Sequence, residues 1–523
     1  MFPTASRIAA LQDDLGRDLD LFQPELVVCG GIVLLLLCRL VKWFDRAHLG
    51  GLAAAALGTA LVVAVMHVGI GIEAKQQSAR FFSDLLVSDT FGGVVRVLIL
   101  AAALLTVVLT RLTRIPDADD SADFYVLLLG GTLGMLLMTA ANHLLMVFIA
   151  VEMASLPSYA LAGFLKGRKK GSEAALKYVV YGAAASGVML YGISLIAGTF
   201  GTGQLSDVAV GTARRVAANG GFDLTLVAGF ALLLAGLGFK LAAVPFHFWC
   251  PDVFEGAAAE VAGFLSVASK AAAVALTTRV LMTLHLSVSQ TDPWLVPRTL
   301  GLAVGIVAAV TVTFGNLAAF GQTNLKRLLA YSTVAHAGYM LLAVSLCSAS
   351  GTSAVIYYLA AYLLMNLGAF AVVALVRNQT GSEELDAYRG LVKRSPVLAV
   401  TLALFLFGLL GLPPLAGFAG KFQVFAALYD GGKAATAGGH AGFGNALFVL
   451  LAVAAVNTAV SAYFYLKVVR AMVLDDGDAP PARTAAGAGA FVSVLAVLLL
   501  ALGVVWNPLV SVADKAAAVI GGR

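Results

Sequence analysis

Six charged or titratable residues lie inside long apolar stretches of this 523-residue chain: Glu152, Lys177, Lys240, Lys270, His336 and Lys421. Placing an ionised group at the middle of a bilayer costs about 3 kcal/mol on insertion scales, so such a residue is retained for a function or by a partner. Lysine suits a proton relay, because its charge responds both to desolvation and to the distance of a neighbouring carboxylate. These residue types predict a buried proton or ion path.

For four of the six a functional role is favoured, although a structural pair with a neighbouring lysine is an alternative explanation for Glu152. Glu152, in FIAVEMASLPSYAL, is too short to reach the headgroups from the middle of its span. Lys240 and Lys270 lie roughly 20 Å from the start of their spans, at 1.5 Å per residue. Lys421 follows a double proline, where backbone carbonyls and water could solvate its charge. We expect these four to belong to the path.

For the other polar residues a structural role competes with a functional one. Lys177 lies one turn after Glu173, so an i,i+4 pair at the interface would also explain it. His336 titrates near neutrality, but a lone membrane histidine can also be a hydrogen-bonded packing residue. His247 lies at a span end beside a proline, which favours a structural role. The remaining two, Arg96 and Arg279, lie near span ends, and we expect them to snorkel.

The composition places the chain in a membrane. Apolar residues make up 60% of it, charged residues only 12%, and the mean hydropathy is +0.92. Soluble domains carry roughly a quarter charged residues. The four cysteines are scattered without C-x-x-C spacing, so no metal-cluster ligand set or disulfide framework is expected. Residues 1–23 mix charges with Ile8, Leu11, Leu15, Leu19 and Phe22, as an interfacial helix would.

Runs of ~20 mostly apolar residues predict an all-α polytopic membrane protein with about fourteen transmembrane helices. They lie near 24–43, 49–69, 92–110, 124–141, 143–164, 173–197, 222–247, 258–284, 298–320, 325–346, 353–376, 395–429, 443–472 and 485–508. A short tail, 509–523, follows, and no stretch between spans is long enough for a soluble domain.

Basic residues concentrate in the loops after odd-numbered spans. They are Arg39, Lys42, Arg46, Arg111, Arg114, Lys166, Arg168, Lys169, Lys170, Lys326, Arg327, Arg377, Arg389, Lys393 and Arg394. The loops after even-numbered spans are nearly free of Lys and Arg, with Arg214 and Arg215 as the main exceptions. By the positive-inside rule the odd loops are cytoplasmic, which predicts both termini on the outer side.

Two predicted spans contain helix breakers. The seventh reads GLGFKLAAVPFHFW and the twelfth LFGLLGLPPLAGFAGKF. Proline removes a helix hydrogen bond, and in lipid the freed carbonyls must find partners, so a broken span normally lines a buried or wet cavity. Two breaks five spans apart predict two structural repeats, each centred on one break.

Several strings resemble one family, subunit N of the proton-pumping NADH–quinone oxidoreductase, respiratory complex I. They are VEMASLPSYALAGF, SEAALKYVVYGAAASGVMLYGISLIAGTFGT, FKLAAVPFHFWCPDVFEG, FLSVASKAA, GNLAAFGQTNLKRLLAYSTVAHAGYM and GLPPLAGFAGKF, between about residues 124 and 430. The resemblance implies an antiporter-like domain over 24–508, with two inverted five-helix repeats and broken helices seven and twelve. It also implies a multi-pass protein of the bacterial inner membrane.

The resemblance also implies roles for the matching positions. Glu152 and Lys240 would form a pair whose separation sets the proton affinity of the lysine. Lys270 would relay protons along the middle of the membrane, and His336 would help between the halves. Lys421 would occupy the second half-channel. A sixth residue, Lys177, also matches a lysine position of this subunit.

The family carries no redox centre in this subunit, so the resemblance implies that NADH, FMN, iron–sulfur clusters and quinone bind to partner subunits of complex I. One departure stands out. After E-G-A, where relatives usually have a proline–threonine–proline segment, this chain has Ala258, Ala259 and Glu260. The start of the eighth span is therefore expected to differ, and Glu260 adds a carboxylate near the path.

Two other readings remain. One is a subunit of a multi-protein cation/proton antiporter or a membrane-bound hydrogenase, against which the SEAALKY and PDVFEG strings argue. The other is a self-contained solute carrier, which is disfavoured because no polar substrate-binding cluster accompanies the lysines.

Overall fold

The structure is a computed structural model that describes residues 5–40, 49–73, 78–118, 120–165, 167, 169–477 and 484–520, with side chains from residue 13 onward. Four of the predicted loop cations, Lys42, Arg46, Lys166 and Arg168, lie outside the described residues. So do the side chains of Ile8 and Leu11.

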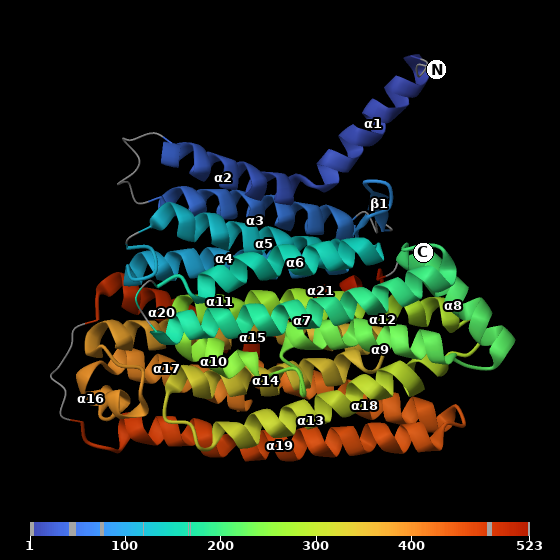
Figure 1. The fold of residues 1–523 in the computed structure, drawn as a ribbon. Helices are drawn as coiled ribbons and strands as arrows, with labels where there is room; N and C mark the ends of the chain where they lie inside the picture. Colours follow the sequence, from blue (N-terminus) through green and yellow to red (C-terminus); the bar gives the residue numbers. More distant parts are fainter. Residues whose placement is uncertain are drawn as a thin grey trace.

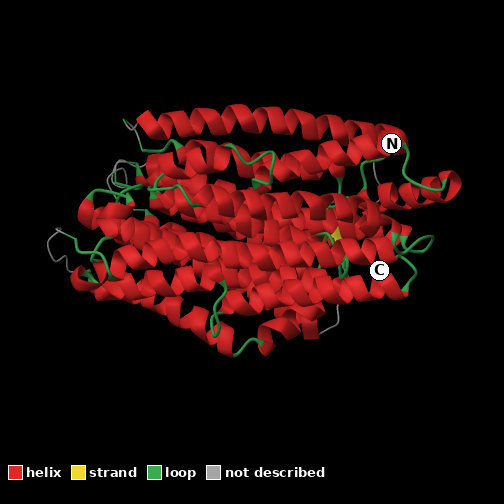
Figure 2. Cartoon of the chain, turned by 90° about the horizontal axis from the view of Figure 1, so that it is seen from below, coloured by secondary structure: helices red, strands yellow, loops and turns green. Residues whose placement is uncertain are grey.

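Long helices run nearly parallel to one another in both views of the molecule (Figures 1 and 2). The first ten are α1 (Ala5–Leu21), α2 (Gln23–Leu40), α3 (Gly50–Glu73), α4 (Thr90–Thr113), α5 (Ser121–Ala140), α6 (Leu144–Ala162), α7 (Lys169–Phe200), α8 (Leu205–Asn219), α9 (Leu224–Leu241) and α10 (Trp249–Gly256). A short antiparallel hairpin, β1 (Ala79–Phe81) and β2 (Leu86–Ser88), lies between α3 and α4, with Arg80 opposite Val87.

The second part of the chain continues the bundle. It contains α11 (Ala259–Phe264), α12 (Lys270–Val288), α13 (Leu302–Ala319), α14 (Leu325–Val344), α15 (Ala349–Thr380), α16 (Leu391–Arg394), α17 (Pro396–Leu410), α18 (Ala416–Ala437), α19 (Ala441–Val473), α20 (Ala486–Val504) and α21 (Asn507–Ala517). Two π-helical turns, Leu265–Ser269 and Pro297–Gly301, precede α12 and α13, and a 3₁₀ turn spans Leu385–Tyr388.

Within the described residues, twelve helices are long and apolar enough to cross a membrane. Two of these spans form the centre of the bundle, because their most apolar windows are almost completely buried: Ala259–Val288 and Ala349–Thr380. By contrast, α2, α3 and α20 expose most of their apolar surface, as lipid-facing helices do. The prediction of an all-helical membrane protein is therefore confirmed.

Both predicted helix breaks are present. The first separates α9, which ends at Leu241, from α10, which begins at Trp249. The second separates α17, which ends at Leu410, from α18, which begins at Ala416. Each interruption contains proline, whose ring and missing N–H prevent the helix from continuing. The predicted twelfth span is thus two helices.

The two ends of the bundle carry different elements. One end, which we call the basic face, carries Lys170, Arg327, Arg377, Arg389 and Lys393 near the starts or ends of their helices and lies at the left of Figure 1, where α16 is labelled. The other end, the hairpin face, carries the β1–β2 hairpin and α8, at the right of Figure 1.

The N- and C-terminal segments are both helical. Helix α1 leaves the bundle at an angle near the hairpin face (Figure 1). Helix α21 falls in the segment predicted as a tail, and it contacts the bundle through a hydrogen bond from Ser353 to Asp514 of 2.5 Å.

Close helix contacts hold the helices that carry the predicted site. A Cβ added to Gly134 of α5 would lie 2.3 Å from the backbone nitrogen of Ala154 on α6. This glycine belongs to the GGTLG string, so helix packing explains the string. Helix α6 carries Glu152, and the glycine contact brings it against the bundle.

Candidate functional site

Lys240 lies in the last turn of α9, immediately before the first helix break, and its side chain is 1% exposed. Its Nζ donates a hydrogen bond of 3.0 Å to Ser155 Oγ on α6. Glu152, one turn earlier on α6, is within electrostatic reach of Lys240. The lysine is therefore held by a neutral hydroxyl, with a carboxylate close by.

Glu152 is half-buried and accepts a hydrogen bond from Ser186 on α7. It forms no direct ion pair with Lys240, although both residues are described. Sequence analysis missed Ser155 and Ser186. The position of Ser155, three residues after Glu152 on a helix, could have placed it on the same face.

Lys270 is completely buried and begins α12 directly after the π-helical turn Leu265–Ser269. Its Nζ donates to the carbonyl of Leu241 at 2.5 Å and lies 3.5 Å from that of Lys240. The ammonium also lies 5.0 Å from the centre of the Trp249 ring. The carbonyls freed by the first break therefore solvate Lys270, while Trp249 begins the helix after it.

Lys421 lies at the second break and is 3% exposed. Its Nζ donates a 2.9 Å hydrogen bond to the carbonyl of Leu410, the last residue of α17, and lies 4.7 Å from the centre of the Tyr339 ring. Gly411 faces this side chain, and a Cβ there would come within 3.0 Å of Lys421 Cδ. The predicted solvation of Lys421 by freed backbone carbonyls is therefore present.

His336 lies in the middle of α14 and is 2% exposed. Its Nδ1 is 2.8 Å from the hydroxyl of Tyr358 on α15, and its Nε2 is 3.2 Å from that of Tyr465 on α19. The Tyr465 hydroxyl in turn lies 2.6 Å from Ser332 Oγ. The imidazole thus joins a chain of hydroxyl groups from three helices.

Lys177 differs from the other residues of the predicted path. Its side chain is 38% exposed, and its Nζ forms 2.7 Å ion pairs with both Glu173 and Asp252 at the basic face. The predicted i,i+4 pair with Glu173 is confirmed. The structure does not bring Lys177 together with the buried lysines.

Two arginines expected to snorkel do not. Arg96 is 4% exposed, and its Nε lies 2.9 Å from the carboxylate of the fully buried Glu25 on α2. Arg279 is buried and binds both carboxylate oxygens of Asp89, at 2.6 and 3.0 Å. The prediction was wrong because a long cation near a span end stays buried when another helix supplies a carboxylate.

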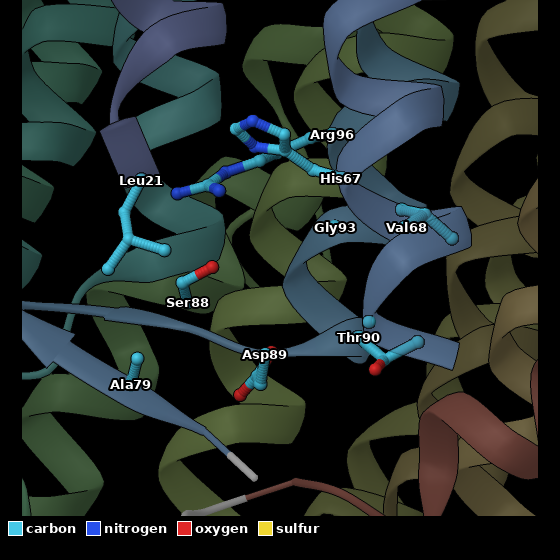
Figure 3. Close-up of a pocket in the computed structure, with 10 residues that line it drawn as sticks. Leu21, His67, Val68, Ala79, Ser88, Asp89, Thr90, Gly93 and Arg96 are labelled. Carbon is cyan, nitrogen blue, oxygen red and sulfur yellow. The ribbon is translucent and has the colours of Figure 1, made fainter. Parts of the chain in front are cut away.

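Near Arg96, a small polar cavity of about 40 Å³ lies between α3, α4 and the hairpin. Figure 3 shows Arg96 and His67 close together in it, with Ser88 and Asp89 on the other side. It is large enough for a few water molecules. None of the predicted path residues lines it.

The arrangement joins two helix breaks with four buried titratable side chains, Lys240, Lys270, His336 and Lys421, inside an all-helical bundle. The partners that contact these side chains are hydroxyls, backbone carbonyls and aromatic rings. The helical bundle with two broken spans that each adjoin a buried lysine defines the class of antiporter-like polytopic membrane proteins.

Comparison with known proteins identifies the family. The family model described as NADH:quinone oxidoreductase/Mrp antiporter, TM, matches residues 141–448. An NADH-quinone oxidoreductase subunit N of Anaeromyxobacter sp. (strain Fw109-5) is 42% identical over 506 residues, 94% of each chain, and a subunit N 2 of Sorangium cellulosum is 39% identical over 497 residues, 93% of this chain and 95% of that one. The chain belongs to the subunit N family of NADH–quinone oxidoreductase.

The solved structures agree. A chain of respiratory complex I from Thermus thermophilus with bound aureothin superposes with a TM-score of 0.73 at 33% identity, covering 96% of this chain and all of that one. A chain of the Mrp complex from Dietzia sp. shares the fold at 22% identity, with a TM-score of 0.80 and coverage of 96% and 98%.

Proposed function

We propose that this chain is a proton-translocating membrane subunit of complex I, in which Glu152, Lys240, Lys270, His336 and Lys421 carry protons. The observation that supports the relay most is the burial of three lysines without a direct ion pair to any described carboxylate. A buried lysine tied to a carboxylate would be held charged, whereas one solvated by hydroxyls and carbonyls can gain and lose a proton.

In the first half, the distance between Glu152 and Lys240 controls loading. With the carboxylate near, the ammonium form of Lys240 is favoured, and with the carboxylate drawn away, the proton leaves. Ser155 and Ser186 hold the two groups close without joining them. Lys270 accepts the proton next, since it lies against the carbonyl of Lys240 and Leu241.

In the second half, His336 and its hydroxyl partners link the centre of the bundle to Lys421. Lys177 has a weaker claim to the relay, because it lies partly exposed at the basic face, paired with Glu173 and Asp252 and away from the buried lysines. Its role there is electrostatic.

The proposed setting is a multi-subunit complex in a bacterial inner membrane, with NADH, FMN, iron–sulfur clusters and quinone bound by partners. A half-exposed carboxylate at mid-span is costly in lipid, so Glu152 supports a protein partner against α6 and α7. With α14 and the broken pair α17–α18 counted beside the twelve candidate spans of the described residues, the helices are enough for the proposed arrangement of about fourteen spans in two inverted repeats. The basic face is then cytoplasmic and both termini lie outside.

The second candidate is a subunit of a cation/proton antiporter, since the family model covers both groups and the Mrp chain shares the fold. The names of the relatives with 39–42% identity favour complex I.

The test is proton pumping in inverted membrane vesicles that contain the assembled complex with Lys240→Ala or Lys421→Ala. We expect each variant to lower NADH-driven pumping at least about tenfold while the subunit stays in the complex. Lys467→Ala is the matched control, since Lys467 also donates to backbone carbonyls, at 3.1 and 3.3 Å, but lies off the axis. Wild-type pumping in both test variants would refute the relay.

A further inference from the structure

Glu260, the carboxylate at the position where the chain departs from its family, is completely buried. It lies in the first turn of α11 and binds Arg377 at the end of α15, with distances of 2.8 and 3.4 Å to its two oxygens. Arg377 is itself 4% exposed. Glu260 and Arg377 therefore form a buried, two-point ion pair at the basic end of the central span.

A second buried pair lies beside the first. Lys326 of α14 is 2% exposed, and its Nζ contacts Glu383 at 2.8 Å and the carbonyl of Ala257 at 2.6 Å. Lys326 is in electrostatic reach of both Glu260 and Arg377. We call Glu260, Lys326, Arg377 and Glu383 the inner charge cluster; its two acids and two bases balance.

The cluster has unused hydrogen-bonding capacity. Arg377 Nε, Glu383 Oε1 and the hydroxyl of the neighbouring Tyr388 are buried without a protein partner among the described residues. Such groups in native proteins are typically satisfied by internal water. The cluster is therefore suited to hold water next to a carboxylate.

A pocket of about 180 Å³ opens at the basic face beside the cluster, although none of the four cluster residues lines it. It is lined by Lys170, Glu173, Ala174, Lys177, Asp252, Glu255, Gly256 and Arg327. Its inner wall adjoins the cluster, because Gly256 and Arg327 are the chain neighbours of Ala257 and Lys326, which contact each other. The chain segments that line the pocket therefore continue directly into the cluster.

On the inner side, the same span leads to Lys270. Glu260 precedes Lys270 by ten residues, roughly 15 Å at helical rise. The only polar side chains between them are Ser266 and Ser269, both buried in the π-helical turn. Ser266 Oγ accepts a 2.6 Å hydrogen bond from Asn366, and Ser269 Oγ has no partner among the described residues. Single π turns occur frequently at functional sites.

We propose that the inner charge cluster is the proton uptake site for Lys270, with Glu260 as the group that accepts the proton; this rests on the proposed relay. Water in the pocket gives a proton to the Glu260 carboxylate, which becomes a neutral carboxylic acid and loosens its pairing with Arg377. The acid then releases that proton through water and the two serine hydroxyls to the uncharged amine of Lys270. The carboxylate re-forms and Lys270 becomes an ammonium group.

The facing groups determine how the step depends on pH. Arg377 on α15 and Lys326 on α14 are the basic side chains that face Glu260, and Glu383 and Tyr388 lie on the connecting segment that follows α15. The Glu260 carboxylate raises the local availability of protons beside the path. Its removal should therefore slow uptake most at high pH, where protons in solution are scarce.

A purely structural ion pair is the competing explanation, and the molecule contains a matched control for it. Glu25 and Arg96 form another buried Glu–Arg pair, 0% and 4% exposed, at 2.9 Å. That pair lies among α2 and α4, away from Lys270. If Glu260 acts only in stability, Glu260→Gln and Glu25→Gln should behave alike.

The experiment compares NADH-driven proton pumping and quinone reduction for Glu260→Gln, Glu25→Gln and Lys270→Ala in the assembled complex between pH 6 and about pH 9. We expect Glu260→Gln to lower coupled turnover about threefold near neutral pH and progressively more at higher pH. Glu25→Gln should keep the wild-type pH profile. Glu260→Asp should restore part of the rate, because it returns a carboxylate.

The outcomes separate the two proposals. Normal pumping in Lys270→Ala would overturn the relay itself. A loss in Lys270→Ala together with a wild-type pH profile in Glu260→Gln would overturn only the uptake site. If Glu260→Gln prevents assembly, the double variant Glu260→Gln/Arg377→Met removes both charges, a change that buried pairs often tolerate. The double variant must then show the same steepened pH profile, and a wild-type profile would refute the proposal.

Discussion

Both helix breaks stabilise a buried lysine, but the groups that surround the lysines differ between them. At each break a buried lysine donates to the carbonyl of the last residue before the interruption, Lys270 to Leu241 and Lys421 to Leu410. Only the first break has a carboxylate in electrostatic reach of one of its lysines, Glu152 beside Lys240. No described carboxylate is in such reach of Lys421, whose other contact is the Tyr339 ring.

This difference indicates that the two breaks have different roles. A carboxylate at variable distance can raise or lower the proton affinity of a lysine, so the first break can respond to a movement of α6 against α9. Fixed carbonyl dipoles and an aromatic face stabilise the ammonium without such control. In the proposed relay, the second break would pass on the proton that the first break delivers through His336.

The largest expected effect comes from removing the acid that distinguishes the first break. Glu152→Gln keeps the shape and the hydrogen bond from Ser186 but removes the charge. We expect proton pumping to fall at least about tenfold, because Lys240 loses the group that controls its loading. Vesicle pumping assays with quantified subunit content measure this.

Glu173→Gln provides the control on the adjacent helix, since Glu173 is 63% exposed and pairs only with Lys177 among described residues. It should pump within about twofold of wild type, as surface ion pairs contribute little. Equal losses of proton pumping in Glu152→Gln and Glu173→Gln would mean that Glu152 does not give the first break a role that the second break lacks.

A second test addresses the backbone at the second break. Gly411 has φ of 91°, a conformation that costs an L-residue about 1–3 kcal/mol, and a Cβ there would come within 3.0 Å of Lys421 Cδ. Gly411→Ala should therefore lower thermal stability of the complex and reduce pumping severalfold. Gly381→Ala has a similar φ of 71° but open space around it, so it should lose stability with unchanged pumping. Indistinguishable pumping in the two variants would contradict a role for this close approach.

Sequence reasoning could predict the lysines and both breaks because each is visible locally. An ionisable residue stands out in an apolar span, and proline interrupts a helix wherever it stands. Tyr358 and Tyr465 could not be predicted as partners of His336, because they come from α15 and α19 and resemble any other membrane tyrosine.

The prediction that Arg96 and Arg279 snorkel was wrong for the same reason. Arg96 and Arg279 satisfy the local criteria for snorkelling, yet the carboxylates that hold them, Glu25 and Asp89, lie 71 and 190 positions away. Similarly, the sequence places the Glu260 carboxylate near the predicted path, but it does not show that Arg377 binds it. Pairing between distant helices depends on the tertiary fold, which no window of the sequence contains.

The hydroxyls around His336 allow a finer test of the link between the breaks. Tyr358→Phe removes the hydroxyl 2.8 Å from Nδ1 with almost no change in volume. We expect a two- to fourfold loss of pumping, about the effect of one neutral hydrogen bond, and a larger solvent deuterium isotope effect. Tyr357→Phe is the control, because that hydroxyl donates to the carbonyl of Leu502 instead. Equal pumping and equal isotope effects in Tyr358→Phe and Tyr357→Phe would mean that Tyr358 is not part of the proposed link between the two breaks.

The smallest effect is expected for Ser155→Ala. Ser155 holds the Lys240 ammonium at 3.0 Å, and its loss leaves that group with the carboxylate of Glu152 as its nearest partner. The alternative partner compensates, so pumping should fall less than about threefold. Combined with Glu152→Gln, however, the same substitution should leave Lys240 with neither partner. The double variant should then lose more activity than the two single losses multiplied together predict, whereas strict additivity would mean that Ser155 and Glu152 act on Lys240 independently.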